Sequence, residues 1–203
     1  MFRYLVDTAL RSGHTINKFR SDFKLRRAKR IVIGAGGSNF AGWVSTDIRT
    51  LDVTCYADFA RYWQPSSRQA FVAEHVWEHL TEEQAKVAAR NCYEFLEPNG
   101  WLRIAVPDEF HPDPGYYELV RPGGSGPGAA DHKVLYNYKT LSEVVSFVGY
   151  KVKRLEYWDE FANFHYVDWI SKDGHIRRSK RFDPRNNDKS LTYTSLIVDA
   201  IKP

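Results

Sequence analysis

Residues 31–47, which read IVIGAGGSNFAGWVSTD, decide the fold that we expect for this chain. They begin with three apolar residues directly after a basic run, and a short β-branched run of this kind predicts a buried parallel strand. Gly34, Ala35 and Gly36 follow at once. Glycine permits a sharp turn and lets a ligand approach the backbone with no Cβ in the way. The stretch therefore predicts a strand that runs into a turn with room for a ligand.

A second short strand is expected at residues 43–46, and it ends on Asp47. A carboxylate at the tip of this strand is placed to accept hydrogen bonds from a ribose diol. The glycines do not complete GxGxxG, so a tight turn without a ligand is the alternative. Strand, glycine turn, strand and acid together form the pattern of a nucleoside-binding α/β site, and the segments downstream favour the ligand.

Length and composition predict a single globular domain over residues 1–203. No apolar run approaches the length of a membrane span, and the N-terminus lacks the apolar region of a signal peptide. Cys55 and Cys92 are typical of small buried apolar residues, not of a disulfide or metal framework. We therefore expect a cytoplasmic, reducing setting, and we name no metal ligands.

The net charge of +4 is concentrated in two basic clusters. The first comprises Lys24, Arg26, Arg27, Lys29 and Arg30, and the second comprises Arg177, Arg178, Lys180, Arg181 and Arg185. Two solvated faces are the ordinary interpretation. The alternative is contact with the phosphates of a nucleic acid, a nucleotide-sugar or a lipid-linked glycan.

Periodicity predicts the other elements. Further strands are expected at residues 51–56, 69–73, 101–106, 150–157 and 191–201, and helices at 2–10, 81–96 and 140–148. Thr81 with Gln84, and Thr140 with Glu143, have capping-box spacing. Residues 109–136 are rich in proline and glycine and predict a long loop, which in a compact domain is usually functional or disordered.

The ordered motifs resemble the small class I S-adenosylmethionine-dependent methyltransferases, in particular type-11-like members associated with glycan and polysaccharide pathways. The resemblance covers residues 30–202 and rests on GAGG before Asp47, AEHVWEHL at 73–80, and FLEPNGWLRIAVPD at 95–108. The last segment is close to the family's LKPGGxLxIxxPD, with Glu97 and Asn99 where lysine and glycine are common. Val32 and Ile33 stand where an acidic residue often precedes the glycines.

The resemblance implies a Rossmann-like α/β fold. The sheet would have seven mostly parallel strands with an antiparallel last strand, and the first crossover helices would be reduced. Residues 1–29 would form an N-terminal helix and basic segment, 30–108 the cofactor-binding half, and 109–203 the acceptor-side half.

The cofactor implied by the resemblance is S-adenosylmethionine, with S-adenosylhomocysteine as the product. The implied cofactor-binding residues are Gly34, Ala35, Gly36, Asp47, Asp58, Ala73, Glu74 and His75. Asp47 would bind the ribose hydroxyls, Asp58 would accept from the adenine amino group, and His75 would lie beside the methyl group. Turn-forming acids at strand ends are the alternative for the two aspartates.

Transfer to a sugar hydroxyl needs a general base, because the hydroxyl is barely acidic. The candidates at the carboxyl ends of the expected strands or on the loops above them are His75, His79, Asp108, His111, Asp131 and His132. We favour His132, with Asp108 or Asp131 beside it. Helix-start structure is the preferred interpretation of Glu78-His79.

The acceptor expected from the resemblance is a carbohydrate or other small molecule, and the reaction is O-methylation of a sugar hydroxyl on a glycan or activated sugar. The segment at residues 173–188 resembles the C-terminal part of the glycan-associated members. The aromatic cluster Trp158, Phe161, Phe164, His165, Tyr166 and Trp169 suggests either core packing or a lid over the acceptor. The alternatives are an RNA or small aromatic acceptor, and a non-catalytic binding module on a degenerate fold.

Overall fold

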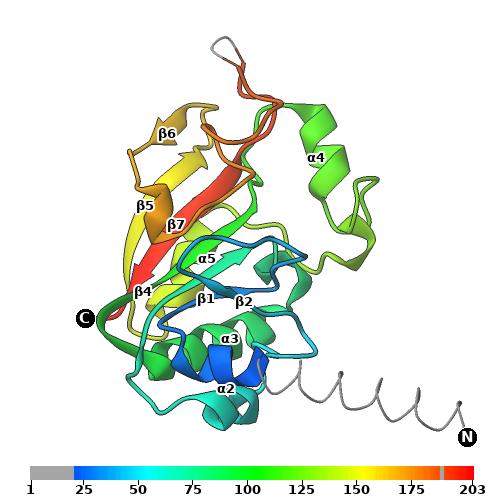
Figure 1. Ribbon diagram of the computed structural model, residues 1–203. Helices are drawn as coiled ribbons and strands as arrows, with labels where there is room; N and C mark the ends of the chain where they lie inside the picture. The colour runs from blue at the N-terminus through cyan, green and yellow to red at the C-terminus, as the bar shows by residue number, and fades with distance from the viewer. Residues whose placement is uncertain (1–20, 188–189) are drawn as a thin grey trace, which may run out of the picture.

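The computed structural model describes residues 21–187 and 190–203, and its centre is one seven-stranded sheet (Figure 1). The helix expected at residues 2–10 lies outside the described residues. The strands are β1 (Arg30–Ile33), β2 (Val44–Ser45), β3 (Arg68–Glu74), β4 (Leu96–Pro107), β5 (Lys151–Trp158), β6 (Phe164–Tyr166) and β7 (Ser195–Ile201). Their order across the sheet is β2-β1-β3-β4-β7-β5-β6.

The strand directions confirm the expected α/β sheet. β1 pairs in parallel with β2 on one side and β3 on the other, and β3 pairs in parallel with β4. β7 is antiparallel to both β4 and β5. Because the chain winds away from β1 in two directions, the carboxyl ends of β1 and β3 border a topological switch point, where ligands bind in open α/β sheets.

The strand expected at residues 51–56 is not formed. Asp52 Oδ1 accepts hydrogen bonds from the backbone and the hydroxyl of Thr54, and the Asp58 carboxylate accepts from the Asp52 backbone N–H. These local bonds satisfy the backbone as a turn before helix α2 (Tyr56–Tyr62). The seventh strand is instead β6, which forms an antiparallel hairpin with β5.

Helices cover one face of the sheet. α2, α3 (Glu82–Phe95) and α5 (Tyr138–Ser146) pack there (Figure 1), against the alternate strand residues that point toward them. In β1, Ile31 and Ile33 face these helices, and Val32 faces the other side. Among the described residues, no helix combines the length and the apolar character needed to cross a bilayer.

The helix starts confirm one expected cap and correct the other. Thr81 and Gln84 form the predicted capping box of α3. α5 begins earlier than expected, because Asn137 is its cap and Thr140 takes the third helical position. The Asn137 side chain accepts from the backbone N–H groups of Lys139 and Thr140, which satisfies donors that a helix start leaves unpaired.

Residues 109–136 are more ordered than a loop. They contain helix α4 (Pro114–Val120), which lies off the edge of the sheet (Figure 1), and the short 3₁₀ turn η2 (Ala129–Asp131). Asp113 caps α4 and Pro114 opens it, as their residue types favour. Two further 3₁₀ turns are η1 (Trp77–His79) and η3 (Ser171–Asp173).

Within residues 21–187 and 190–203, the other face of the sheet is covered by loops and short turns and not by α-helices. Residues 34–43 join β1 to β2 with no helix, as the expected reduction of the first crossovers requires. Arg103 is buried on this face, pairs with Asp199 at 2.7 Å, and donates to the Gly174 carbonyl at 2.6 Å. Its guanidinium also lies over the Trp169 ring. Arg103 thereby holds the segment around residues 169–176 against the sheet.

Candidate functional site

Two adjoining cavities lie at the carboxyl ends of β1 and β3. The histidine cavity is lined by the glycine turn, Phe40, Glu74, Glu78, Pro127, His132, Arg177 and Arg178. The aspartate cavity is lined by Asp47, Ile48, Leu51, Asp52, Val53, Thr54, Leu80 and Gln84, and its volume of about 450 Å³ suits a small molecule. The two cavities share Ile33, Gly34, Gly36, His75 and His79.

Gly34 and Gly36 in the glycine turn have different physical roles. Both Gly34 and Gly36 have positive φ, at 61° and 52°. A Cβ on Gly34 would lie 2.6 Å from Val76 Cγ2, so this position is required by packing within the protein. A Cβ on Gly36 would meet no atom within 4 Å and would project from a residue that lines both cavities. Gly36 is therefore the position where the turn leaves space for a ligand.

Asp47 stands at the end of β2, as expected. Its Oδ1 accepts from the Thr50 hydroxyl at 2.9 Å and from the Thr50 N–H at 3.0 Å. Its Oδ2 pairs with the Arg49 guanidinium, whose side chain is 88% exposed. Hydrogen bonds from Arg49 and Thr50 hold the pKa of this carboxyl below its ordinary value. The exposed Arg49 is a weak competitor, so Oδ2 can accept from a ligand instead.

Asp58 does not line either cavity. Its Oδ2 accepts from the Asp52 backbone N–H at 2.9 Å and so supports the turn. Asp52 itself lines the aspartate cavity together with Asp47. Asp52 was not among the predicted site residues, because a strand over residues 51–56 would place Asp58, just past its end, at the site. The signal that could have identified Asp52 is that it is the second acidic residue after β2, five positions beyond Asp47.

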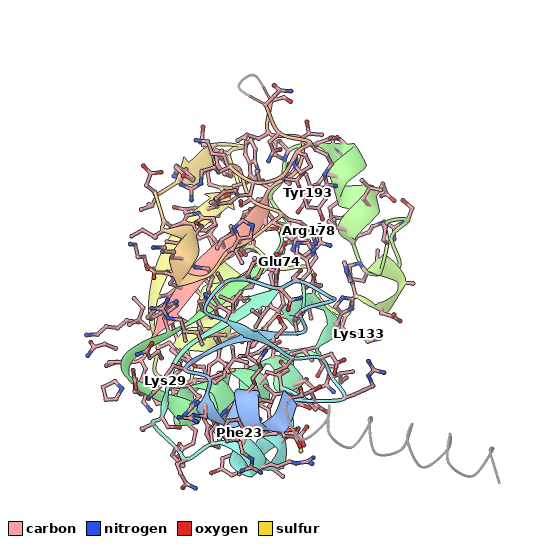
Figure 2. All side chains as sticks on the ribbon, viewed as in Figure 1. Phe23, Lys29, Glu74, Lys133, Arg178 and Tyr193 are labelled. Carbon is pink, nitrogen blue, oxygen red and sulfur yellow. The ribbon has the colours of Figure 1, made fainter. Side chains whose placement is uncertain are left out.

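Glu74 reaches the histidine cavity, whereas Ala73 is buried in the core on the helix-covered face. The Glu74 carboxylate accepts from the backbone N–H groups of Arg177 at 3.1 Å and Arg178 at 2.9 Å. Figure 2 shows Glu74 and Arg178 close together, and their side chains form an ion pair at 3.6 Å. Glu74 thus positions the basic segment at the cavity wall.

His75 lines both cavities and has a strained backbone. Its φ of 55° is a left-handed conformation that side-chain-bearing residues rarely adopt, and such strain is concentrated at functional sites. Nε2 lies 3.0 Å from Ser195 Oγ, and Nδ1 lies 3.1 Å from Glu78 Oε1. The imidazole is therefore held between β7 and the η1 turn, at the point where the cavities meet.

His132 lies in the histidine cavity, although its sequence position is far from the other lining residues. Its Nδ1 donates to the Val120 carbonyl at 2.6 Å, so Nε2 carries the free lone pair. The Glu78 carbonyl accepts from the Lys133 N–H at 2.7 Å, which brings His132 beside η1. The His132 and His79 rings meet edge to face at 4.8 Å.

The carboxylate beside His132 is Glu78, not one of the two we expected. Asp108 is buried, and its oxygens accept from the backbone N–H groups of Phe110 and Trp158. Asp131 is exposed. His111 stacks on Tyr116 with ring centroids 3.9 Å apart, and burial lowers the pKa of its imidazole. None of these three residues lines either cavity, because the 109–136 segment reaches the site only near Pro127 and His132.

Asp108 is expected to make stability depend on pH. Burial raises its pKa from 3.8 to about 7, so the folded state binds the proton more tightly than the unfolded state. This contribution is fully present below the unfolded pKa and is lost as pH rises through about 7. Between pH 5 and 8, the unfolding free energy of the wild type should fall by about 2–3 kcal/mol relative to Asp108→Asn. Denaturant melts of both proteins check this, and parallel pH profiles would contradict it.

The second basic cluster divides between two roles. Arg177 and Arg178 line the histidine cavity, whereas Arg181 lies over the Trp169 and Phe182 rings, and Arg185 pairs with Asp183 at 2.6 Å. In the first cluster, Lys29 pairs with Glu97, and Arg30 lies over the Trp43 and Trp101 rings. All members of the second cluster, and all of the first except the half-buried Arg30, are exposed, so both clusters are solvated as expected, and several members also make these local contacts.

The late aromatic residues do not form a lid over the histidine cavity. Trp169 is buried against the sheet, and its indole N–H donates to the buried Glu156 carboxylate. Trp158 and Tyr166 border a separate hollow with Lys180 and Arg181. Packing therefore accounts for Trp169, whereas Phe161 is exposed, and the ring that lines the histidine cavity beside the imidazoles is Phe40.

The fold is shared with methyltransferases of known structure. A methyltransferase from Thermotoga maritima, described as S-adenosylmethionine-dependent and a possible histamine N-methyltransferase, matches with a TM-score of 0.51 and 10% identity over 93% of this chain and 96% of that one. An S-adenosylmethionine-dependent methyltransferase from Mesorhizobium loti matches with a TM-score of 0.50 and 10% identity, over 86% of this chain and 90% of that one. No family model and no curated protein matches the sequence. The chain thus has the Rossmann-like fold of class I methyltransferases.

Proposed function

We propose that this chain is an S-adenosylmethionine-dependent methyltransferase that methylates a sugar hydroxyl on a glycan or activated sugar. The observation that carries the proposal is the meeting of Gly36 and Asp47 in one cavity at the switch point of the sheet. An open glycine and an acid at the tip of the second strand are what a nucleoside needs there. The fold shared with methyltransferases supports the same assignment.

The aspartate cavity suits the adenosine part of the cofactor. Ile48, Leu51 and Val53 offer apolar contact for the base, and Asp47 Oδ2 would accept from the ribose hydroxyls. Asp52 is the acid that we propose for contact with the nucleoside in place of Asp58. The sulfonium would then lie where the two cavities meet, beside Gly36 and His75.

The histidine cavity would hold the acceptor. In the reaction, a bond forms between the acceptor oxygen and the methyl carbon while the carbon–sulfur bond breaks, leaving neutral S-adenosylhomocysteine. The acceptor hydroxyl also loses its proton, and we assign this step to the side of the cavity formed by Glu78, His79 and His132. His132 Nε2, which carries a free lone pair, is the group that we propose to act on the hydroxyl.

Two features of the histidine cavity favour an acidic sugar or a sugar that carries a phosphate. Arg177 supplies positive charge at the wall, where Arg178 is paired with Glu74, and Phe40 supplies an apolar ring for stacking. The same charges are compatible with RNA, which remains the second candidate acceptor. The salt dependence of acceptor binding distinguishes RNA from a sugar, because binding that uses many phosphate contacts weakens steeply as the salt concentration rises.

A cofactor titration and an acceptor panel test the proposed function. Calorimetry should show binding of S-adenosylmethionine and S-adenosylhomocysteine, one molecule per chain. Methyl transfer should then be measured with sugar phosphates and nucleotide-sugars, uncharged glycosides, RNA and small phenols. No cofactor binding by folded protein would defeat the proposal. Transfer to RNA or phenols alone would replace the sugar by the alternative acceptor, and cofactor binding without transfer would favour a non-catalytic module.

Asp47→Ala should weaken S-adenosylmethionine binding by about 1–3 kcal/mol, or roughly 5–150-fold, because a hydrogen-bonded charge is lost. Asp47→Asn is the matched variant, since its amide oxygen can still accept from the Thr50 N–H and hydroxyl that hold the turn. It should melt closer to the wild type than Asp47→Ala and still bind the cofactor weakly. If calorimetry gives Asp47→Asn the wild-type affinity, the carboxylate is only a turn former.

A further inference from the structure

We propose that Glu78, His79 and His132 form a binding site for one divalent transition-metal ion in the histidine cavity. Each residue offers one ligand atom, a carboxylate oxygen or an imidazole nitrogen, and these three atoms lie within 4.8 Å of one another. All three residues line the same cavity. One carboxylate and two imidazoles are a donor set that suits Mn²⁺, Co²⁺ and Zn²⁺.

The Glu78 carboxylate supplies an independent argument for a cation. Its side chain is fully buried, yet neither oxygen has a hydrogen-bond partner among the described residues. His75 Nδ1 lies 3.1 Å from Oε1, but the two groups are not aligned as a hydrogen bond. Removing a carboxylate from water without compensating partners costs several kcal/mol. A cation held at these oxygens offsets that cost.

His132 is already oriented as a ligand should be. Its Nδ1–H donates to the Val120 carbonyl at 2.6 Å, which leaves the Nε2 lone pair for an ion. Metal-binding histidines almost always make such a second hydrogen bond, because it fixes the tautomer and the ring orientation. The Lys133 and Val134 N–H groups bond to the Glu78 carbonyl at 2.7 and 3.3 Å, so the backbone fixes the two ligands relative to each other.

An ion with three protein ligands keeps coordination positions open toward the cavity. In the methyl transfer proposed above, an acceptor hydroxyl bound there would become more acidic and would give its proton to solvent water. Because an ion would engage the His132 Nε2 lone pair, the ion would replace the imidazole as the group that acts directly on the hydroxyl. This role rests on the proposed function, whereas binding of the ion does not.

Calorimetry with MnCl₂ tests the site, using the full chain after treatment with EDTA and desalting. We expect one Mn²⁺ per chain, and at least about tenfold weaker Mg²⁺ binding, since Mg²⁺ prefers oxygen ligands. His79→Asn and His132→Asn should each weaken Mn²⁺ binding at least about 100-fold. Mutation of a residue that only hydrogen-bonds to a metal ligand already lowers metal affinity about 10–100-fold. His165→Asn is the matched control, since His165 pairs with Asp159 outside the cavity.

Three further measurements keep the outcomes separate. Thermal melting in EDTA establishes that each variant is folded. A Co²⁺-loaded sample should show visible absorption bands that His79→Asn abolishes and His165→Asn retains. No binding of Mn²⁺, Co²⁺ or Zn²⁺ by the wild type, or equal binding by folded His79→Asn and His132→Asn, would overturn the metal site. Cofactor binding is titrated in EDTA. If the cofactor does not bind, the proposed methyltransferase function is wrong, but the proposed ion site is unaffected.

Discussion

His132→Ala should slow methyl transfer by about 10²–10⁴-fold while cofactor affinity stays within a few-fold of the wild type. The imidazole lies in the histidine cavity, whereas the acid expected at the cofactor ribose, Asp47, lines the other cavity. The rate should fall whether the imidazole takes the proton itself or holds an ion that acts on the hydroxyl. Single-turnover rates and calorimetry with S-adenosylmethionine measure the two quantities separately.

Folding must be checked in this experiment, because His132 is largely buried and its Nδ1–H bonds the Val120 carbonyl. Losing that bond should cost about 1 kcal/mol, which lowers the melting temperature without unfolding the domain. His165→Ala serves as the control, since that imidazole is on β6 and pairs with Asp159. A His132→Ala rate within a few-fold of the wild type would remove His132 from the mechanism and leave His75 and His79, the two imidazoles that line both cavities.

Gly36→Val should weaken S-adenosylmethionine binding at least about 100-fold, which corresponds to about 2.7 kcal/mol. The side chain would enter open space at a residue that lines both cavities, so it would occupy the volume proposed for the ligand. Gly34→Val is not an equivalent test. Its Cβ would collide with Val76, so a loss of binding there would also report damage to the protein.

Gly37→Val is the matched control for this substitution. Gly37 also has positive φ, and a Cβ there also meets no atom within 4 Å, but the residue lines neither cavity. Both variants should therefore lose similar stability through left-handed strain, about 1–2 kcal/mol each. Only Gly36→Val should lose the cofactor. Equal affinities of the two variants, measured by calorimetry, would show that the glycines form only a turn.

The sequence by itself was sufficient for the sheet elements around the switch point and for the order of the motifs. β1, β3 and the centre of β4 are short apolar runs that favour buried strands, and Thr81 with Gln84 marks the start of α3 by side-chain chemistry alone. Asp47 at the end of β2 followed from the same local pattern. These features depend on neighbours along the chain, which the sequence displays directly.

Where local chemistry competes, the sequence was misleading. Residues 51–56 look like a strand by alternation, but Asp52, Thr54 and Asp58 satisfy the backbone as a turn. Thr140 and Glu143 have the right spacing for a capping box, but the N-cap of α5 is Asn137, three residues earlier. β6 has only three residues, and its pairing with β5 is needed to define it.

Tertiary structure alone decided which groups share the candidate site. Glu78, an expected helix-start residue, faces His132 because backbone N–H groups of the 133–134 segment bond to the Glu78 carbonyl. Glu74 brings Arg177 and Arg178 to the cavity wall through hydrogen bonds to their backbone, whereas Asp108 is turned away by its bonds to Phe110 and Trp158. These long-range bonds have no periodicity in the sequence, because each satisfies a buried polar group with whichever backbone the fold brings within reach.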